Sequence, residues 1–234
     1  KKIELFGDGI GAVELVDHMG SDLTIVNSAR VSFGKEKEEL DAKDKKLINY
    51  LVKHRHTSTF EHNVATFRFL VPLFIRSQHH RHRTWSYNEI SRRYTAVDMR
   101  FYEPDQFRSQ HKSNRQASED VLVNPTLNSS FLQGGTALAS EAVSRHHTNS
   151  LSLYNSLLDS GVCREQARGV LPQNLYTEYF GTVNLHNLLK FVSLRVHEGA
   201  QWEIQQVAKA CLQIAKQYFP HSVQAYAKKH NMEL

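Results

Sequence analysis

Cysteine is scarce in this chain of 234 residues, which contains only Cys163 and Cys211 and no CxxC pair. Two isolated cysteines exclude a disulfide scaffold and are typical of a reducing compartment, so we expect both to be packing residues. Long hydrophobic runs are missing too. The longest markedly apolar run, residues 69–75, is far shorter than the roughly 20 residues that cross a bilayer. The sequence therefore predicts a soluble, cytoplasmic protein.

The first residues of the chain also lack the unbroken apolar core of a secretory signal, because Glu4, Asp8 and Glu14 interrupt them. We therefore expect no export signal. Hydrophobic residues make up 40% of the chain and charged residues 23%, which is ordinary for a globular protein, and we predict a single domain over residues 1–234. The net charge of +5 favours anionic ligands, although it does not distinguish a nucleotide from a nucleic acid.

The first half of the chain shows helical and strand patterns. Residues 38–53 carry apolar side chains at helical spacing, with acids early and lysines late, which predicts a surface helix. Residues 65–71 alternate at a period of two and predict a strand that Pro72 ends. Pro72 can in turn open a helix toward Arg83, because proline suits the first helical position.

The second half is predicted to be mainly helical after a long loop. Residues 103–135 are polar and hold two of the five prolines, so we expect a long loop or a partly mobile insertion there, followed by a helix over residues 136–158. An apolar stripe from Ile204 to Tyr218 predicts a structural helix that Pro220 stops. The fold class expected is α/β of the α+β type: helix-rich, with a small antiparallel sheet, in a single compact unit.

The segment of residues 81–94 carries four arginines, two serines and one glutamate with almost no aliphatic residue. Guanidinium groups and hydroxyls donate directional hydrogen bonds of the kind that phosphate oxygens accept, and Glu89 can accept from a base or ribose. A charged helix end would explain residues 79–83, but not the acid, amide and hydroxyls that follow. The segment therefore predicts an anion site, and a nucleotide fits its mixture of groups.

Six of the fourteen histidines lie between residues 54 and 82, which raises the alternative of a metal site. Arginines interleaved among them would repel a cation, and no HExxH pattern is present. We therefore predict no metal.

Two further segments carry arginines at helical spacing. Arg164 and Arg168 lie one turn apart, which suggests either an anion site or a structural pair with Glu165 or Glu178. In residues 184–195, Asn184 and Arg195 fall on the same face as an apolar stripe. An arginine facing inward needs a carboxylate or a ligand as its partner. We expect these arginine-bearing segments to converge around one ligand.

Residues 81–94 resemble the signature of the flavin-dependent thymidylate synthases, Arg-His-Arg-x-x-Ser-x-Asn-Glu-x-Ser-x-Arg-Tyr, at every fixed position. The resemblance extends from about His54 to Gln206. It implies that Arg195 is catalytic and stabilises the uracil ring as its N3 proton is lost. It implies a flavin site of His56, Ser58, Arg81, His82, Arg83, Glu89, Asn184, Leu185, His186 and Lys190. It implies a deoxyuridylate site of Gln78, His79, His80, Arg81, Glu89, Ile90, Ser91, Arg92, Arg93, Arg168 and Arg195.

The resemblance also implies the reaction, in which dUMP becomes dTMP, methylenetetrahydrofolate donates the carbon and FAD reduced by NADPH donates the hydride. It further implies a homotetramer with active sites shared between chains, and neither a nucleic acid nor a membrane as partner. The alternative is a basic nucleic-acid-binding module, in which the arginines contact phosphates while Trp85, Tyr87 and Tyr94 stack on bases.

Overall fold

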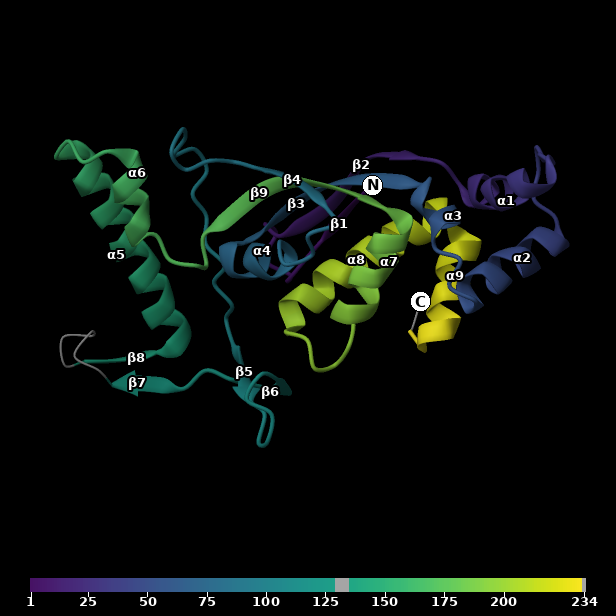
Figure 1. Cartoon of the computed structure of the whole chain (residues 1–234). Helices are drawn as coiled ribbons and strands as arrows, with labels where there is room; N and C mark the ends of the chain where they lie inside the picture. Colours follow the sequence, from purple (N-terminus) through teal and green to yellow (C-terminus); the bar gives the residue numbers. More distant parts are fainter. Residues whose placement is uncertain (129–134, 233–234) are drawn as a thin grey trace.

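The computed structural model describes residues 1–128 and 135–232, and its main feature is a five-stranded sheet (Figure 1). The strand order is β1-β2-β3-β9-β4, and every neighbouring pair is antiparallel. The strands are β1 (Lys2–Glu4), β2 (Ala12–Met19), β3 (Val64–Pro72), β4 (Ser86–Glu89) and β9 (Tyr176–Asn184). The antiparallel sheet and the excess of helix over strand confirm the predicted fold class, while the single-domain organisation stays a prediction.

Strand β3 lies at the centre of this sheet and confirms the predicted alternation. Its side chains Ala65, Phe67, Phe69 and Val71 are all buried in the main core. The intervening residues face the opposite side of the sheet, where Arg68 forms an ion pair with Glu178 on β9 at 2.7 Å. The strand therefore has one apolar and one polar face, as a sheet covered on one side requires.

Helices cover the apolar face of the sheet. Figure 1 shows α4 (Leu73–His79), α7 (Leu185–Arg195) and α8 (Trp202–Tyr218) on the same side of it. The apolar stripe of α8 is buried, as predicted, and the helix ends just before Pro220. Pro220 also begins the next helix, α9 (Pro220–His230), whose first position suits a residue without a backbone N–H.

A second group of helices lies at one end of the sheet, around α9. It consists of α1 (Asp22–Arg30), the 3-10 turn η1 (Val31–Phe33), α2 (Ala42–Lys53) and α3 (Ser58–Glu61). Helix α2 is shorter than the predicted helix over residues 38–53. Its N-cap, Asp41, accepts hydrogen bonds from the backbone N–H groups of Lys43 and Asp44, which fixes the start of the helix.

Residues 103–135 are not the plain loop that was predicted. They contain β5 (Phe107–Gln110), which pairs with β6 (Ser118–Val123), and β7 (Thr126–Asn128), which pairs with β8 (Thr136–Leu138). These strands are short, with few buried residues, so composition alone concealed them. Residues 129–134 of the predicted loop lie outside the described residues. The helix predicted over 136–158 begins later, as α5 (Ala139–Asp159), because Thr136–Leu138 forms β8. Figure 1 shows α5 standing apart from the main sheet.

The two cysteines have different environments. Cys211 is buried in α8, as expected for a packing residue, whereas Cys163 is exposed, so that expectation was wrong for it. Cys163 lies at the N-cap of α6 (Arg164–Ala167), which the 3-10 turn η3 (Arg168–Val170) follows. None of the helices that the structure describes is long and apolar enough to cross a membrane. The cytoplasmic location stays a prediction.

Gly181 on β9 makes room for an indole ring. It pairs with Phe67 on one side and Tyr87 on the other. A Cβ atom at this position would lie 2.9 Å from the Phe69 ring and 3.2 Å from the ring of Trp85. Trp85 is 6% exposed and immediately follows the arginine-rich turn, so the absence of a side chain at 181 lets this tryptophan anchor the turn to the sheet.

Candidate active site

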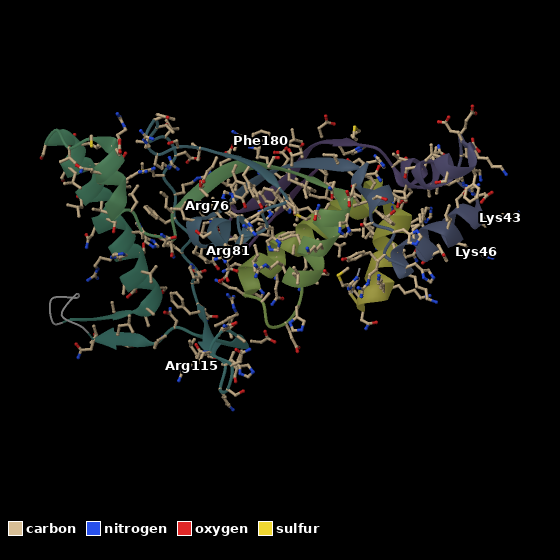
Figure 2. All side chains as sticks on the ribbon, viewed as in Figure 1. Lys43, Lys46, Arg76, Arg81, Arg115 and Phe180 are labelled. Atoms are coloured by element: carbon tan, nitrogen blue, oxygen red, sulfur yellow. The ribbon has the colours of Figure 1, made fainter. Side chains whose placement is uncertain are left out.

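The signature segment leaves helix α4 and enters strand β4 through a turn. Helix α4 ends at His79, earlier than the predicted end near Arg83, and the backbone N–H of His80 closes it by bonding to the carbonyl of Arg76 at 2.9 Å. Arg81 and Arg83 lie on the turn and are exposed. Figure 2 shows where Arg81 lies on the ribbon. Neither arginine has an ion-pair partner among residues 1–128 and 135–232, so both guanidinium groups are free to meet an anion.

His79 is fully buried among aromatic rings, although the resemblance implies a nucleotide contact for it. Its Nδ1 shares a hydrogen bond of 2.8 Å with the hydroxyl of Tyr179, and its ring packs on Trp85 and Phe191. Burial holds the pKa of His79 well below its ordinary value. Since the ring has no exposed surface for a ligand, we leave His79 out of the proposed site. Its neighbour His80 is half-buried and stacks on Tyr87.

The predicted catalytic arginine, Arg195, lies in the last turn of α7 and is half-buried. Its Nε donates a hydrogen bond of 3.0 Å to Nε2 of His82. Burial, together with Arg195 and Lys190, lowers the pKa of His82 to about 4, so this histidine is neutral near pH 7 and can accept the bond. No carboxylate among the described residues pairs with Arg195, so nothing here neutralises its charge.

A cavity of about 340 Å³, which we call the β4 pocket, brings five of the predicted nucleotide residues together. Four of them come from β4 and the residues after it, and Arg168 comes from η3. The lining consists of Leu73, Arg76, Glu89, Ile90, Ser91, Arg92, Arg168, Leu171, Leu175, Tyr176 and Thr177. The signature segment and the second arginine segment therefore do converge.

The acid of the β4 pocket is held in a fixed orientation. Oε1 of Glu89 accepts a hydrogen bond of 2.6 Å from the hydroxyl of Thr177 and lies 3.1 Å from Nε of Arg76. Arg92 is also fixed, since it donates to the carbonyl of Val97 at 2.7 Å, and burial lowers its pKa. Glu89 thus presents a second carboxylate oxygen from a rigid position, which suits recognition of a hydroxyl or N–H donor.

At the rim of the β4 pocket, Arg93 and Arg168 meet at Glu165. The carboxylate of Glu165 pairs with Arg93 at 3.6 Å, and Nε of Arg168 donates to its backbone carbonyl at 3.3 Å. Both arginines are exposed. Neither candidate carboxylate forms an ion pair with Arg168. The carboxylate of Glu165 binds Arg93, and the carboxylate of Glu178 binds Arg68. Arg168 therefore keeps its guanidinium group available for an anion.

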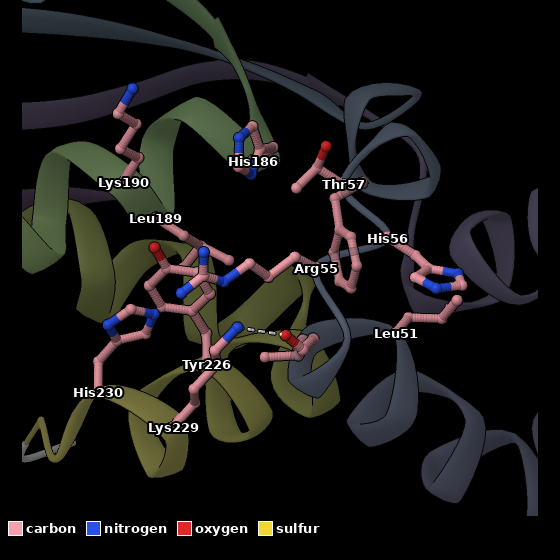
Figure 3. Close-up of a pocket in the computed structure, with 12 residues that line it drawn as sticks. Leu51, Arg55, His56, Thr57, His186, Leu189, Lys190, Tyr226, Lys229 and His230 are labelled. Carbon is pink, nitrogen blue, oxygen red and sulfur yellow. Dashed lines mark hydrogen bonds between the residues drawn. The ribbon is translucent and has the colours of Figure 1, made fainter.

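A second cavity, of about 310 Å³, lies between α2, α7 and α9 and is called here the α2–α9 pocket (Figure 3). It unites three predicted flavin residues, His56, His186 and Lys190. Its lining is Leu51, Val52, Arg55, His56, Thr57, Phe60, His186, Leu189, Lys190, Tyr226, Lys229 and His230. The lining holds cations and histidines above an apolar floor and includes no acid.

Burial and neighbouring cations lower the pKa of three groups in the α2–α9 pocket. Burial and the neighbouring Arg55 lower the pKa of Lys229, and burial with Lys229 and Arg55 lowers that of His230. Burial also lowers the pKa of His186. Figure 3 shows Lys229 donating to the backbone carbonyl of Val52, at 2.6 Å. Such a pocket attracts an anion that carries an apolar or aromatic body.

Several predicted flavin residues lie outside both linings. Ser58 is exposed at the start of α3, and Leu185 is 1% exposed within the core. Asn184 is the N-cap of α7 and its side chain accepts from the backbone N–H of Asn187 at 2.9 Å, so it serves its own helix. The expectation that it shares a face with Arg195 stays a prediction.

The two pockets share no lining residue. Within one chain the arginine-bearing segments therefore gather in separate places: Arg168 with Glu89, and Arg195 with His82. The expectation that all these segments converge around one ligand therefore holds only in part. Sequence reasoning also missed lining residues in both pockets, among them Arg76, Arg55 and Lys229. Arg76 stands two positions before Gln78 and could have been suspected, but Lys229 carries no local signal of its role.

Comparisons with known proteins identify the family of this chain. The family model described as "Thymidylate synthase complementing protein" matches residues 14–221. The flavin-dependent thymidylate synthase of Thermus thermophilus is 44% identical over 223 residues, which cover 95% of this chain and 77% of that protein. This chain belongs to the same family. The flavin-dependent thymidylate synthase of Thermotoga neapolitana is 41% identical over 218 residues, covering 93% and 91% of the two chains.

Solved structures extend the likeness from the sequence to the fold of this family member. The crystal structure of the UMP/dUMP methylase PolB from Streptomyces cacaoi, bound with 5-Br dUMP, has a TM-score of 0.81 and 34% identity, and covers 99% of this chain and 100% of its own. The same methylase bound with 5-Br UMP gives a TM-score of 0.78. The recognised family is thus confirmed by sequence and fold together.

Proposed function

We propose that this member of the flavin-dependent thymidylate synthase family converts dUMP to dTMP. The observation that carries the proposal is the β4 pocket, where Glu89, Ser91 and Arg168 from two separate segments line one cavity. An acid, a hydroxyl and an unpaired guanidinium are the groups that a nucleoside monophosphate needs. The names of the relatives and the nucleotide bound to PolB point to the same substrate class.

In this proposal the phosphate of dUMP binds at the rim of the β4 pocket. Arg168 and Ser91 contact it, and Arg93 is held beside them by Glu165. The rigid Glu89 accepts a hydrogen bond from the sugar or base. These contacts bind and orient the nucleotide, and they include no protein nucleophile.

Arg195 stabilises the negative charge that the uracil ring acquires as its N3 proton is lost. Its charge is available for that task because its partner is the neutral ring of His82. A carboxylate in the same place would offset the guanidinium charge before the substrate arrived. The half-buried setting of Arg195 strengthens the interaction further, since water screens it less.

The α2–α9 pocket suits FAD and the co-substrates, which combine aromatic rings with phosphates or carboxylates. Its apolar floor can pack against a ring, and Lys190 with His56 and His186 can face negative charge. When bound and reduced by NADPH, the flavin supplies the hydride, and methylenetetrahydrofolate supplies the carbon. The chain contributes binding and orientation. Arg81, Arg83 and Ser58, which are exposed outside the pocket, are proposed to contact the same cofactor.

We also infer a homotetramer in which sites are completed between chains. The support is the separation of the two pockets in one chain, since a nucleotide in the β4 pocket and a flavin in the α2–α9 pocket must come together to react. A second copy that brings its own β4 pocket to the Arg195 and His82 of the first would meet this requirement.

The decisive experiment is an absorption spectrum of the pure protein with and without added dUMP, followed by an assay for dTMP with NADPH and methylenetetrahydrofolate. We expect a yellow protein whose flavin spectrum shifts with dUMP and which forms dTMP. A colourless protein that binds oligonucleotides with a steep salt dependence would overturn the proposal in favour of a nucleic-acid-binding module.

A further inference from the structure

A chain of hydrogen bonds runs from helix α4 into a buried acid. Nε2 of Gln78 donates to Oε1 of Gln201, the N-cap residue of α8. Nε2 of Gln201 donates to Oε2 of Glu203 at 2.9 Å. The other carboxylate oxygen of Glu203 accepts from the hydroxyl of Tyr102 at 3.2 Å and from Arg108 on β5. Gln201 and Glu203 therefore link α4 to the segment of residues 102–108, and Glu203 is 4% exposed.

Glu203, at the end of this series of hydrogen bonds, sets the direction of every bond in the series. An ionised carboxylate can only accept, and Arg108 and Tyr102 both donate to Glu203. Gln201 must therefore turn its NH₂ group toward Glu203, which leaves its carbonyl oxygen facing α4. Gln78 can satisfy that oxygen only with its own NH₂ group. The carbonyl oxygen of Gln78 is consequently the end that is left for a ligand.

We propose that Gln201 and Glu203 are positioning residues that hold the Gln78 amide with its carbonyl oxygen toward the base of the nucleotide. The inference rests on the proposed function and on the contact between Gln78 and deoxyuridylate that the family resemblance implies. It adds two residues outside the signature segment and gives the contact a direction. It also involves the β5–β6 hairpin, because Arg108 fixes the carboxylate and its guanidinium lies 4.6 Å from the centre of the Trp202 ring.

A fixed carbonyl oxygen discriminates between pyrimidines. The ring of uracil carries a hydrogen at N3, which can donate to this oxygen, whereas N3 of cytosine is an acceptor and would face it lone pair to lone pair. A freely rotating glutamine amide could present NH₂ to cytosine instead. The clamp formed by Gln201 and Glu203 therefore favours a uracil nucleotide by roughly tenfold, the size expected when a mismatch leaves a polar group unpaired.

The same geometry predicts how the kinetics change when the clamp is lost. The bond from N3–H exists when dUMP binds and weakens as N3 loses its proton. An interaction of the ground state alone lowers KM without raising kcat. Loss of the clamp should therefore raise KM for dUMP and leave kcat unchanged or higher, which a merely structural role would not produce.

The test uses the complete chain with its flavin and the variant Gln201→Met, which keeps the size of a half-buried side chain but removes both hydrogen bonds. We expect KM for dUMP to rise roughly tenfold, and the ratio of the dissociation constants of dCMP and dUMP to fall roughly tenfold. The matched control, Gln205→Met, lies on the same helix and loses a hydrogen bond of 2.9 Å to the carbonyl of Ala200, and it should change neither value.

A second variant, Glu203→Gln, keeps the shape of the acid but lets Gln201 turn either way, so it should shift the dCMP to dUMP ratio in the same direction. Thermal unfolding of each variant shows whether it is folded. If the folded Gln201→Met protein keeps the wild-type KM for dUMP and the wild-type ratio of dCMP to dUMP dissociation constants, the proposed role of Gln201 and Glu203 is wrong while the proposed function stands. If the wild-type protein itself does not bind dUMP, both fall.

Discussion

The two pockets of this chain hold their positive charge in different ways. In the β4 pocket, Arg76 pairs with the acid Glu89, so both charged groups are held in fixed orientations. In the α2–α9 pocket, Arg55, Lys190 and Lys229 line the cavity and no acid is present in the lining. A paired site of fixed geometry suits a small ligand with directional groups. A site whose cations have no acidic partner suits a larger ligand, because its several negative charges do not each need a hydrogen bond to one particular atom.

The strongest test of this division concerns Arg195, which lines neither pocket and is proposed to act on the base itself. Arg195→Ala should lower kcat for dTMP formation by about 10²- to 10³-fold, the loss typical of one charge-stabilising donor. The fold should persist, since the only side-chain partner of Arg195 in the described part of the chain is His82. Circular dichroism and turnover measure both effects, and near-normal turnover would refute the role.

The next test separates the pockets. Arg168→Ala should weaken dUMP binding by roughly tenfold or more, because a charge-assisted phosphate contact is lost, and should leave flavin binding unchanged. Titration calorimetry measures the first and flavin content the second. Arg164→Ala is the control, since Arg164 is exposed one turn away and does not line the pocket. Equal dUMP affinity for wild type and Arg168→Ala would remove Arg168 from the site.

A change in the α2–α9 pocket should act on binding and stability with opposite signs. Arg55 has a φ of 60°, a left-handed conformation that favours glycine. Arg55→Gly should raise the free energy of unfolding by about 0.5–1 kcal/mol and weaken flavin binding by about threefold, as for one exposed charge. Chemical denaturation and flavin titration measure the two effects.

Arg55→Lys keeps both the charge and the backbone strain, so it should change neither stability nor flavin affinity appreciably. Stability that fell in Arg55→Gly would contradict the strain argument, and flavin affinity equal to wild type would remove Arg55 from the cofactor site.

The smallest effect expected is a pH dependence carried by His82. Its pKa in the folded protein, about 4, is below the ordinary value of 6.5, so the unfolded chain takes up the proton first as the pH falls. Stability is therefore present above pH 6.5 and declines as the pH falls toward 4. His79, His80 and His186 have pKa values lowered in the same direction.

The variant His82→Gln isolates this contribution, because its amide can still accept from Arg195 but does not titrate. Between pH 7.5 and 5, wild type should lose about 1 kcal/mol more than the variant, after allowing for solvent screening of a half-buried ring. Urea unfolding at both pH values measures the difference. Identical losses would show that His82 is not held neutral by the fold.

Local patterns predicted the elements that are governed by neighbours in sequence. The period of two in β3 and the stripe of α8 were visible because each buries one face, and Pro72 and Pro220 marked boundaries through their missing N–H groups. The strands within residues 103–135 escaped because they are short and mostly exposed, so no apolar alternation marks them. The family signature located the β4 segment directly.

Relations in three dimensions could not be predicted in the same way. His79 has the sequence context of a ligand contact, yet two of the aromatic rings around it, Phe191 and Tyr179, come from α7 and β9, which no local pattern connects to it. Lys229 and Arg55 are 174 positions apart, and only the packing of α2 on α9 brings them to one pocket. The separation of Arg168 from Arg195 likewise depends on where α5 and α6 lie relative to the sheet.

The missing side chain at Gly181 makes a position outside both pocket linings matter to substrate chemistry. A single added methyl group there would press on the indole of Trp85, which is three residues from His82 and packs against His79. Because that core is tightly packed, the displacement would pass to the turn that carries the arginines. Substitutions at 181 are therefore expected to impair turnover in a protein that still folds, a defect easily mistaken for damage to the active site itself.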